Sequence, residues 1–157
     1  MIEIRKANLE DQTEILTIYN ETTLHLLKRE IKQWEYPWDA EIILKEIKKN
    51  ESYVVLFNRT FAGAFCMSPL EKLSTLTIEP EGVYLSKIAI LPKYQGKNLG
   101  SEVVNFACSF AKQRNLALYL DCWAGNEKLK EFYLGNGLEY IGDFPEEDYF
   151  ISIFKQQ

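Results

Sequence analysis

The chain has little of the chemistry on which many hydrolases and metalloenzymes depend. Its 157 residues include a single histidine, His25. A Ser-His or Cys-His site, or a metal site with a histidine ligand, would therefore have to use His25. This residue lies in an apolar stretch with helical periodicity and has no nucleophile motif beside it. We interpret it as structural and predict no metal site, so acid–base chemistry must use carboxylates, tyrosines, a thiol or water.

The few cysteines argue against both a zinc site and a disulfide framework. Cys66, Cys108 and Cys122 are odd in number, widely spaced and without a CxxC pair. Each lies in an apolar run with strand or helix character, so we expect three buried thiols. Free thiols are typical of a reducing compartment, and the sequence therefore predicts a cytoplasmic location.

Excess positive charge and long apolar runs are also missing. The formal net charge is −5, which disfavours broad binding to nucleic acid. Residues 1–6 carry charges where a signal peptide would be apolar, and no run approaches the roughly 20 apolar residues that cross a bilayer. We expect a soluble protein with no membrane partner. The 13% aromatic content rules out a disordered chain.

Hydrophobic periodicity predicts one α/β domain with a mixed sheet. Asn8 and Asp39 are expected to cap the first two helices. The residues 58–60 are expected to form a tight hairpin connection. Strands are predicted at 2–6, 53–57, 61–67, 75–78, 83–91, 116–122, 138–144 and 148–154, and helices at 9–29, 40–50, 101–114 and 126–134.

The segment most informative about function runs from a strand through a small-residue loop into a helix. Gly96 and Gly100 allow positive φ and close approach of a ligand, and the N-terminus of the following helix offers unpaired amides to a phosphate. Lys97 and Ser101 add a cation and a hydroxyl. An ordinary strand-to-helix turn explains the glycines equally well. Neither GxxxxGK[ST] nor GxGxxG is present, which excludes a P-loop and a dinucleotide fingerprint.

This loop resembles the acetyl-CoA motif of the GNAT superfamily of N-acetyltransferases, Arg/Gln-x-x-Gly-x-Gly/Ala. Gln95 occupies its first position and Gly100 its last, while Asn98 stands where the family usually has glycine. Asparagine is the residue besides glycine that best tolerates a left-handed backbone, so the loop can persist. The resemblance extends through Leu120-Asp121-Cys122, Asn126 and Phe132-Tyr133, and its order of elements covers essentially the whole chain.

The resemblance implies a single domain over residues 1–157. Its expected sheet is mixed and mostly antiparallel, with about six or seven strands flanked by about four helices. It also implies acetyl-CoA as cosubstrate, with Tyr133 as general acid toward the leaving thiolate. The residues that would contact acetyl-CoA are Ile88, Ala89 and Ile90 along the pantetheine arm, Gln95, Gly96, Lys97, Asn98, Leu99, Gly100 and Ser101 around the pyrophosphate, and Asn126 near the thioester.

Structural alternatives stay open for two of these residues. Asn126 and Tyr133 are seven residues apart and lie within roughly 20° of one helical face, as a shared site requires. A plain N-cap explains Asn126 equally well. Core packing would explain Tyr133.

The general base and the acceptor pocket are not identified by the sequence. Some relatives carry a glutamate on the strand before the motif, but this chain has Tyr84 there. Glu79, Glu81 or a water chain are the alternatives. A second open set is aromatic, and these residues either line an acceptor pocket or pack beneath a loop: Trp34, Tyr36, Trp38 and Trp123.

The sequence therefore predicts an acetyl-CoA-dependent N-acetyltransferase that acts by direct attack of a primary amine. The acceptor, a small molecule or a peptide, is left open, and a homodimer could form through the exposed aromatic residues or through the last two strands. The rival hypothesis is a CoA-binding module that has lost catalysis. A third, an interaction domain without a nucleotide ligand, requires every loop feature to be incidental.

Overall fold

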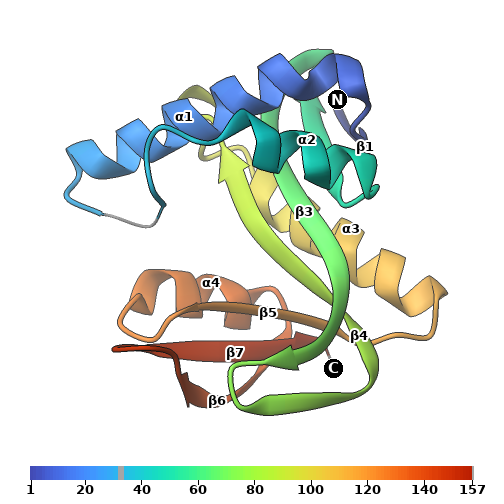
Figure 1. Ribbon diagram of the computed structural model, residues 1–157, viewed down its shortest axis with the longest axis vertical. Coiled ribbons are helices and arrows are strands. Elements are labelled where there is room, and N and C mark those ends of the chain that lie inside the picture. Colours follow the sequence, from blue (N-terminus) through green and yellow to red (C-terminus); the bar gives the residue numbers. More distant parts are fainter. Residues whose placement is uncertain (32–33, 157) are drawn as a thin grey trace. The chain divides into compact units, whose positions relative to one another are not determined.

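The computed structural model describes residues 1–31 and 34–156, which form both strands and helices (Figure 1). The strands are β1 (Ile2–Lys6), β2 (Ser52–Phe57), β3 (Thr60–Leu73), β4 (Leu76–Ile90), β5 (Leu118–Trp123), β6 (Leu138–Pro145) and β7 (Phe150–Gln156). The helices are α1 (Gln12–Lys28), α2 (Ala40–Lys48), α3 (Leu99–Gln113) and α4 (Glu127–Gly135), with 3₁₀ turns η1 (Leu9–Asp11) and η2 (Pro92–Tyr94).

The strands form one seven-stranded sheet in the order β1-β2-β3-β4-β5-β7-β6. The pairs β1–β2, β2–β3, β5–β7 and β6–β7 are antiparallel, whereas β4 and β5 are parallel. This confirms the predicted α/β fold with a mixed, mostly antiparallel sheet.

The chain divides into two compact units, which are described separately. Unit 1 comprises residues 1–66 and 87–103, and unit 2 comprises residues 67–86 and 104–157. Strands β3 and β4 and helix α3 each contribute residues to both units.

In unit 1, Asn8 and Asp39 are caps as predicted, but residues 9–11 form the 3₁₀ turn η1, so α1 begins at Gln12 rather than at residue 9. The Asn8 side chain accepts a hydrogen bond from Glu10 N–H and forms a capping box with Asp11, and Asp39 accepts from Glu41 N–H at the start of α2. Helices α1 and α2 lie side by side (Figure 1). Their apolar faces form one core with β2, represented by Ile15, Ile18, Tyr19, Ile43, Ile47, Val54 and Leu56.

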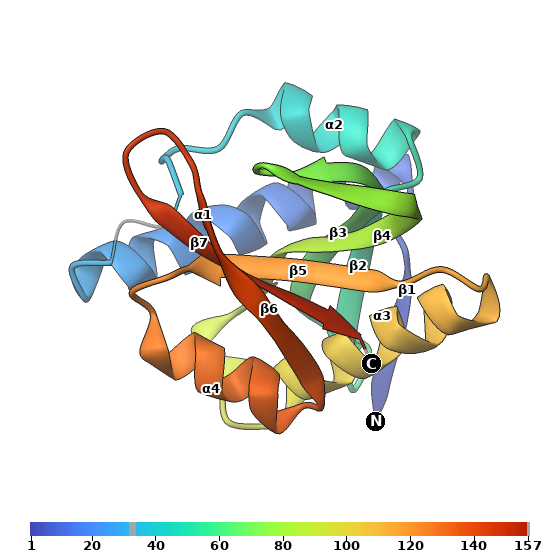
Figure 2. The same ribbon diagram turned by 90° about the horizontal axis from the view of Figure 1, so that it is seen from below.

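In unit 2 the strand β7 lies between β5 and β6, with α4 beside β6 (Figure 2). Leu118 and Leu120 of β5 and Ile153 and Phe154 of β7 are almost completely buried. Tyr119, on the opposite face of β5 from Leu118 and Leu120, is 8% exposed. Both faces of β5 are therefore covered in its first half, whereas Trp123 at its end is exposed.

The hairpin of β3 and β4 is longer than predicted. Pro69, Pro80 and Gly82 favoured interrupted strands, but β3 continues to Leu73 and β4 is one strand rather than two. Burial outweighs these strand-breaking residues, because three apolar residues of the hairpin pack with Tyr119, Ile151 and Ile153 of unit 2. They are Leu70, Leu73 and Ile78. By contrast, the predicted turn at 58–60 is confirmed as a two-residue connection with positive φ at Asn58 and Arg59.

The cysteine prediction needs one correction. Cys66 and Cys122 are buried free thiols as predicted, but Cys108 is partly exposed, because it lies at the margin of the buried face of α3. Separately, none of the helices in the described ranges is both long and apolar enough to cross a membrane.

Candidate functional site

The C-terminal end of β4 in unit 1 is the strand that precedes the predicted cofactor loop. Ala89 is buried, and Ile88 and Ile90 are half-buried. Gly63 of β3 lies directly against this segment, since a Cβ atom there would stand 2.6 Å from the Ala89 carbonyl oxygen and 2.8 Å from Cδ1 of Ile90. Close packing against β3 therefore fixes where the backbone of residues 88–90 lies.

A local distortion of β4 occurs at Lys87, just before these three residues. Lys87 has φ of +55°, a left-handed conformation that costs a non-glycine residue about 1 kcal/mol or more. Two contacts within unit 1 hold it: its carbonyl accepts from the Tyr19 hydroxyl at 2.8 Å, and its ammonium pairs with Glu46. The direction of the last part of β4 is thus set by side chains from α1 and α2.

The predicted phosphate loop contains two residues with a left-handed backbone. Gly96 has φ of +84° and Asn98 has φ of +63°. Asn98 thus has the left-handed backbone that the sequence predicts for an asparagine in place of glycine. The Gln95 side chain donates from Nε2 to the Ile90 carbonyl at 3.1 Å, which ties the loop back to the end of β4.

Helix α3 begins directly after this loop. Leu99 is 2% exposed and anchors the helix start in the core. The Glu102 N–H donates to the Asn98 carbonyl at 3.1 Å, so the N–H groups of Leu99, Gly100 and Ser101 have no partner within the helix. These three groups, with the positive end of the helix dipole, can receive a phosphate oxygen. Lys97 is exposed beside them.

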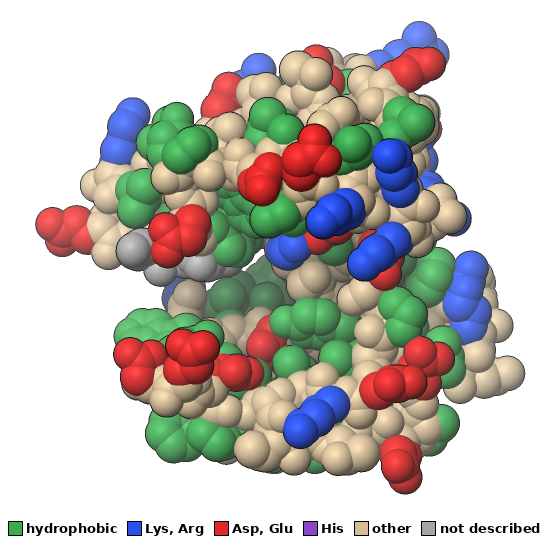
Figure 3. All heavy atoms as spheres, in the orientation of Figure 1, with side chains coloured by type: hydrophobic (Ala, Val, Ile, Leu, Met, Phe, Trp, Pro, Cys, Tyr) green, Lys and Arg blue, Asp and Glu red, His purple; other side chains and the backbone are tan. Residues whose placement is uncertain are grey.

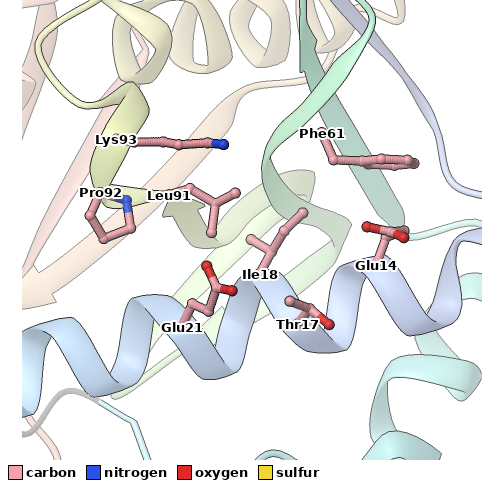
Figure 4. Close-up of a pocket in the computed structure, with 8 residues that line it drawn as sticks. All are labelled: Glu14, Thr17, Ile18, Glu21, Phe61, Leu91, Pro92 and Lys93. Atoms are coloured by element: carbon pink, nitrogen blue, oxygen red, sulfur yellow. The ribbon is translucent and has the colours of Figure 1, made fainter.

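Unit 1 also contains an open cavity of about 390 Å³ between α1 and η2 (Figure 4). Glu14, Thr17, Ile18 and Glu21 of α1 line one side of this cavity, and Phe61, Leu91, Pro92 and Lys93 line the other. Two carboxylates against one lysine make it a poor site for a pyrophosphate. The loop at 95–101 is the better candidate for the phosphates.

The surface charge agrees with a local rather than a general anion site. On the face drawn in Figure 3, Lys and Arg side chains are interspersed with Asp and Glu side chains. With the net charge of −5, this distribution does not favour neutralisation of a long polyanion.

In unit 2, Asn126 and Tyr133 lie at the two ends of α4. Asn126 is the N-cap, and its Oδ1 accepts from Leu129 N–H at 3.1 Å. Asn126 therefore caps α4 through its side-chain oxygen, and its side-chain NH₂ group can still donate to a ligand. Tyr133 is 5% exposed and packs edge-on against Phe154 at 5.4 Å. Burial raises the pKa of its hydroxyl, which keeps the phenol protonated.

Unit 2 further contains a Tyr–Asp pair that the sequence analysis does not identify. The Tyr84 hydroxyl of β4 donates to Oδ1 of Asp121 in β5 at 2.7 Å. Burial raises the pKa of Asp121, an effect that the hydrogen bond from Tyr84 opposes. Burial also raises the pKa of Tyr84. In the sequence, Asp121 stands out as the single carboxylate of the otherwise apolar strand Leu118–Trp123. Residue spacing does not show that its partner is Tyr84.

The other residues singled out from the sequence are more ordinary. His25 is a partly exposed residue of α1, and Glu79 and Glu81 are exposed on β4. Among the described residues, no group of three or more His, Cys, Asp or Glu side chains is arranged to hold a metal ion.

The aromatic candidates for an acceptor pocket belong to both units and are described unit by unit. In unit 1, Trp34 and Trp38 pack against Tyr19, with the Trp38 ring stacked at 4.6 Å, and Tyr36 is exposed. Trp123 belongs to unit 2 and is 61% exposed. Within unit 1, Trp34 and Trp38 thus pack on the ring of Tyr19 in α1.

Comparison with known proteins gives one consistent result. Residues 13–137 match the model of the acetyltransferase (GNAT) family. The fold is similar to that of a GNAT-family acetyltransferase from Listeria monocytogenes, with a TM-score of 0.79 and 20% identity over 99% of this chain and 94% of the other.

Two further solved structures with this fold were determined with a cofactor. The PaiA N-acetyltransferase from Thermoplasma acidophilum in complex with coenzyme A has a TM-score of 0.76 and 17% identity, covering 100% of this chain and 99% of that one. YncA from Salmonella typhimurium with acetyl-CoA has a TM-score of 0.72 and 16% identity, covering 99% and 93%.

Proposed function

Because this chain belongs to the acetyltransferase (GNAT) family, we propose that it moves an acetyl group from acetyl-CoA to a primary amine. The observation that carries the proposal is the loop at 95–101. Positive φ at Gly96 and Asn98 and three N–H groups without intrahelical partners at the start of α3 form a site for the pyrophosphate. Two similar structures hold CoA or acetyl-CoA.

We assign the remaining contacts to acetyl-CoA as follows. Backbone groups of Ile88, Ala89 and Ile90 would bind the pantetheine arm, because they end a strand whose course is fixed by Gly63 and Lys87. The side-chain NH₂ of Asn126 would donate to the arm. The Tyr133 hydroxyl, protonated because burial raises its pKa, would give its proton to the departing thiolate.

Direct attack by the amine is favoured over an acetylated cysteine. Burial raises the pKa of the Cys122 thiol to about 11 and that of Cys66 to about 12. A protonated thiol is a poor nucleophile. Free buried thiols also fit a reducing compartment, and we propose that the protein acts in the cytoplasm.

The decisive experiment is release of the CoA thiol from acetyl-CoA in the presence of amines. The panel contains propylamine, spermidine, lysine and a short peptide with a free N-terminus. We expect turnover with at least one of them, and Tyr133→Phe should retain acetyl-CoA affinity while kcat falls about 10²-fold or more. Tyr149→Phe, at an exposed tyrosine of the same unit, is the matched control.

A second candidate function is a CoA-binding module without catalysis. The observation that favours it is Tyr84, which occupies the position of the glutamate found in some relatives. Tight binding of acetyl-CoA without thiol release for any amine would support the second function and contradict the first.

A further inference from the structure

Asp121 is a recessed carboxylate that lacks a cationic partner. It is half-buried in β5, on the same face of the strand as Tyr119, which is 8% exposed. Its side-chain partner is the neutral hydroxyl of Tyr84 at 2.7 Å. Within the described part of the chain, no Lys, Arg or His forms an ion pair with it. Removing a carboxylate from water without an opposite charge is costly.

Two other shielded carboxylates in this chain show the usual arrangement. Asp11 is held by Arg5 at 2.7 Å, and Glu46 is paired with Lys87. In both cases the cation belongs to the protein. Asp121 is different, because the cation that would compensate its charge is not among the residues around it.

Given the proposed function, on which this inference rests, we infer that Asp121 binds the ammonium group of the acceptor and accepts its proton, and that Tyr84 positions the carboxylate. Asp121 is thus assigned as a catalytic residue and Tyr84 as a positioning residue. The acceptor class is a primary amine that arrives as a cation. This assignment fills the role of the glutamate that the chain lacks at position 84.

The groups around Asp121 suit this role. They are Tyr84 of β4, Tyr133 of α4, Cys122 of β5 and Glu146 in the connection of β6 and β7, each of which is linked electrostatically with Asp121. All lie in unit 2, so the proposed base and the proposed acid Tyr133 belong to one compact unit. None of the four carries a positive charge that would repel an ammonium. Burial makes the Asp121 carboxylate a stronger base than an exposed aspartate.

The proton and electron balance of the step is complete. The acceptor R–NH₃⁺ gives one proton to Asp121 and becomes R–NH₂. Its lone pair then forms the C–N bond at the thioester carbonyl, and the C–S bond breaks with its electron pair leaving on sulfur. The sulfur takes a proton from Tyr133, and the second proton lost by nitrogen restores Tyr133. The products are the amide, the CoA thiol and one proton released from Asp121 to solvent.

Asp121→Asn tests the proposal, because asparagine keeps an oxygen that accepts from Tyr84 but cannot take a proton. With propylamine we expect kcat/KM to fall about 10²–10⁴-fold, while acetyl-CoA binding is unchanged. The trifluoromethyl analogue of propylamine has a more acidic ammonium group and is partly deprotonated without help. The fall in kcat/KM caused by Asp121→Asn should therefore be smaller with this analogue than with propylamine.

Tyr84→Phe provides a second readout that a purely structural role would not move. The hydrogen bond from Tyr84 lowers the pKa of Asp121, so its removal should raise that pKa. Asp121 must be ionised to act, and the acid limb of the kcat/KM profile should then shift to higher pH. This measurement decides the question even if Asp121→Asn fails to fold.

The matched control is the exposed pair of Tyr140 and Asp143 in the same unit, which has the same 2.7 Å hydrogen bond. Tyr140→Phe and Asp143→Asn should leave the rate and the pH profile unchanged. Three results would overturn the role of Asp121 and leave the proposed function standing. They are wild-type activity in Asp121→Asn, an equal fall in kcat/KM with both amines, and an acid limb that does not shift in Tyr84→Phe. Failure of the wild-type chain to acetylate any amine would instead overturn the proposed function, and the inference with it.

Discussion

At the scale of single residues, Gly100 connects the loop geometry to cofactor affinity. It is the second residue of α3, and its N–H is one of the three without a partner in the helix. Valine at this position would place a branched side chain where the pyrophosphate is proposed to lie. We expect Gly100→Val to lower acetyl-CoA affinity at least tenfold, or about 1.4 kcal/mol, as measured by isothermal titration calorimetry.

The control for this variant is Gly135→Val at the end of α4, where a new Cβ would meet no atom within 4 Å. It should bind acetyl-CoA like the wild-type chain. Since valine is tolerated in a helix better than glycine, Gly100→Val should also stay folded by circular dichroism. A folded Gly100→Val variant with wild-type affinity would show that the cofactor site lies elsewhere.

At the scale of elements, the end of β4 depends on its close contact with β3. A Cβ on Gly63 would stand 2.6 Å from the Ala89 carbonyl oxygen, which belongs to the backbone and can move only with its strand. Overpacking of this kind typically costs about 1–3 kcal/mol. We predict that Gly63→Ala lowers the free energy of unfolding in urea by this amount. It should also weaken acetyl-CoA binding, because residues 88–90 would shift.

Gly135→Ala serves as the comparison for this substitution, because its new methyl group meets open space and should leave stability equal or slightly higher. An unchanged midpoint and an unchanged slope of urea unfolding in Gly63→Ala would contradict the argument. That result would mean that β3 and β4 separate without cost, and the course of β4 would then need another explanation.

At the scale of the whole molecule, the sequence predicts local features better than long-range ones. The caps at Asn8 and Asp39 and the turn at Asn58 are predicted correctly, because each is decided by a few neighbouring residues. The continuous β4 is missed, since contacts with Ile151 and Ile153 outweigh its proline.

The candidate site shows the same division. The left-handed backbone at Asn98 follows from residue type and motif position. The hydrogen bond of Tyr84 to Asp121 joins residues 37 positions apart, and the distortion at Lys87 depends on Tyr19 and Glu46. Periodicity carries no information about either arrangement.

The loop that we propose for the pyrophosphate, residues 95–101, belongs to unit 1, and acetyl-CoA bound there should stabilise the folded chain. Saturation at about a hundred times Kd should stabilise the fold by roughly 2.7 kcal/mol, a rise in Tm of about 5–10 °C for a domain of this size. Free CoA should act similarly and ATP should not. Trp123→Phe removes the tryptophan of unit 2 and leaves Trp34 and Trp38 to report on unit 1 by fluorescence.

Circular dichroism of the same variant reports on both units together. If residues 1–157 behave as one domain, the two signals will give one Tm and the same shift with acetyl-CoA. A shift in the fluorescence of unit 1 alone would restrict the site to the loop at 95–101 and remove Asn126 from it. Equal rises in Tm with ATP and acetyl-CoA would show that the loop binds phosphate groups in general. The assignment of residues 88–90 to the pantetheine arm would then be wrong.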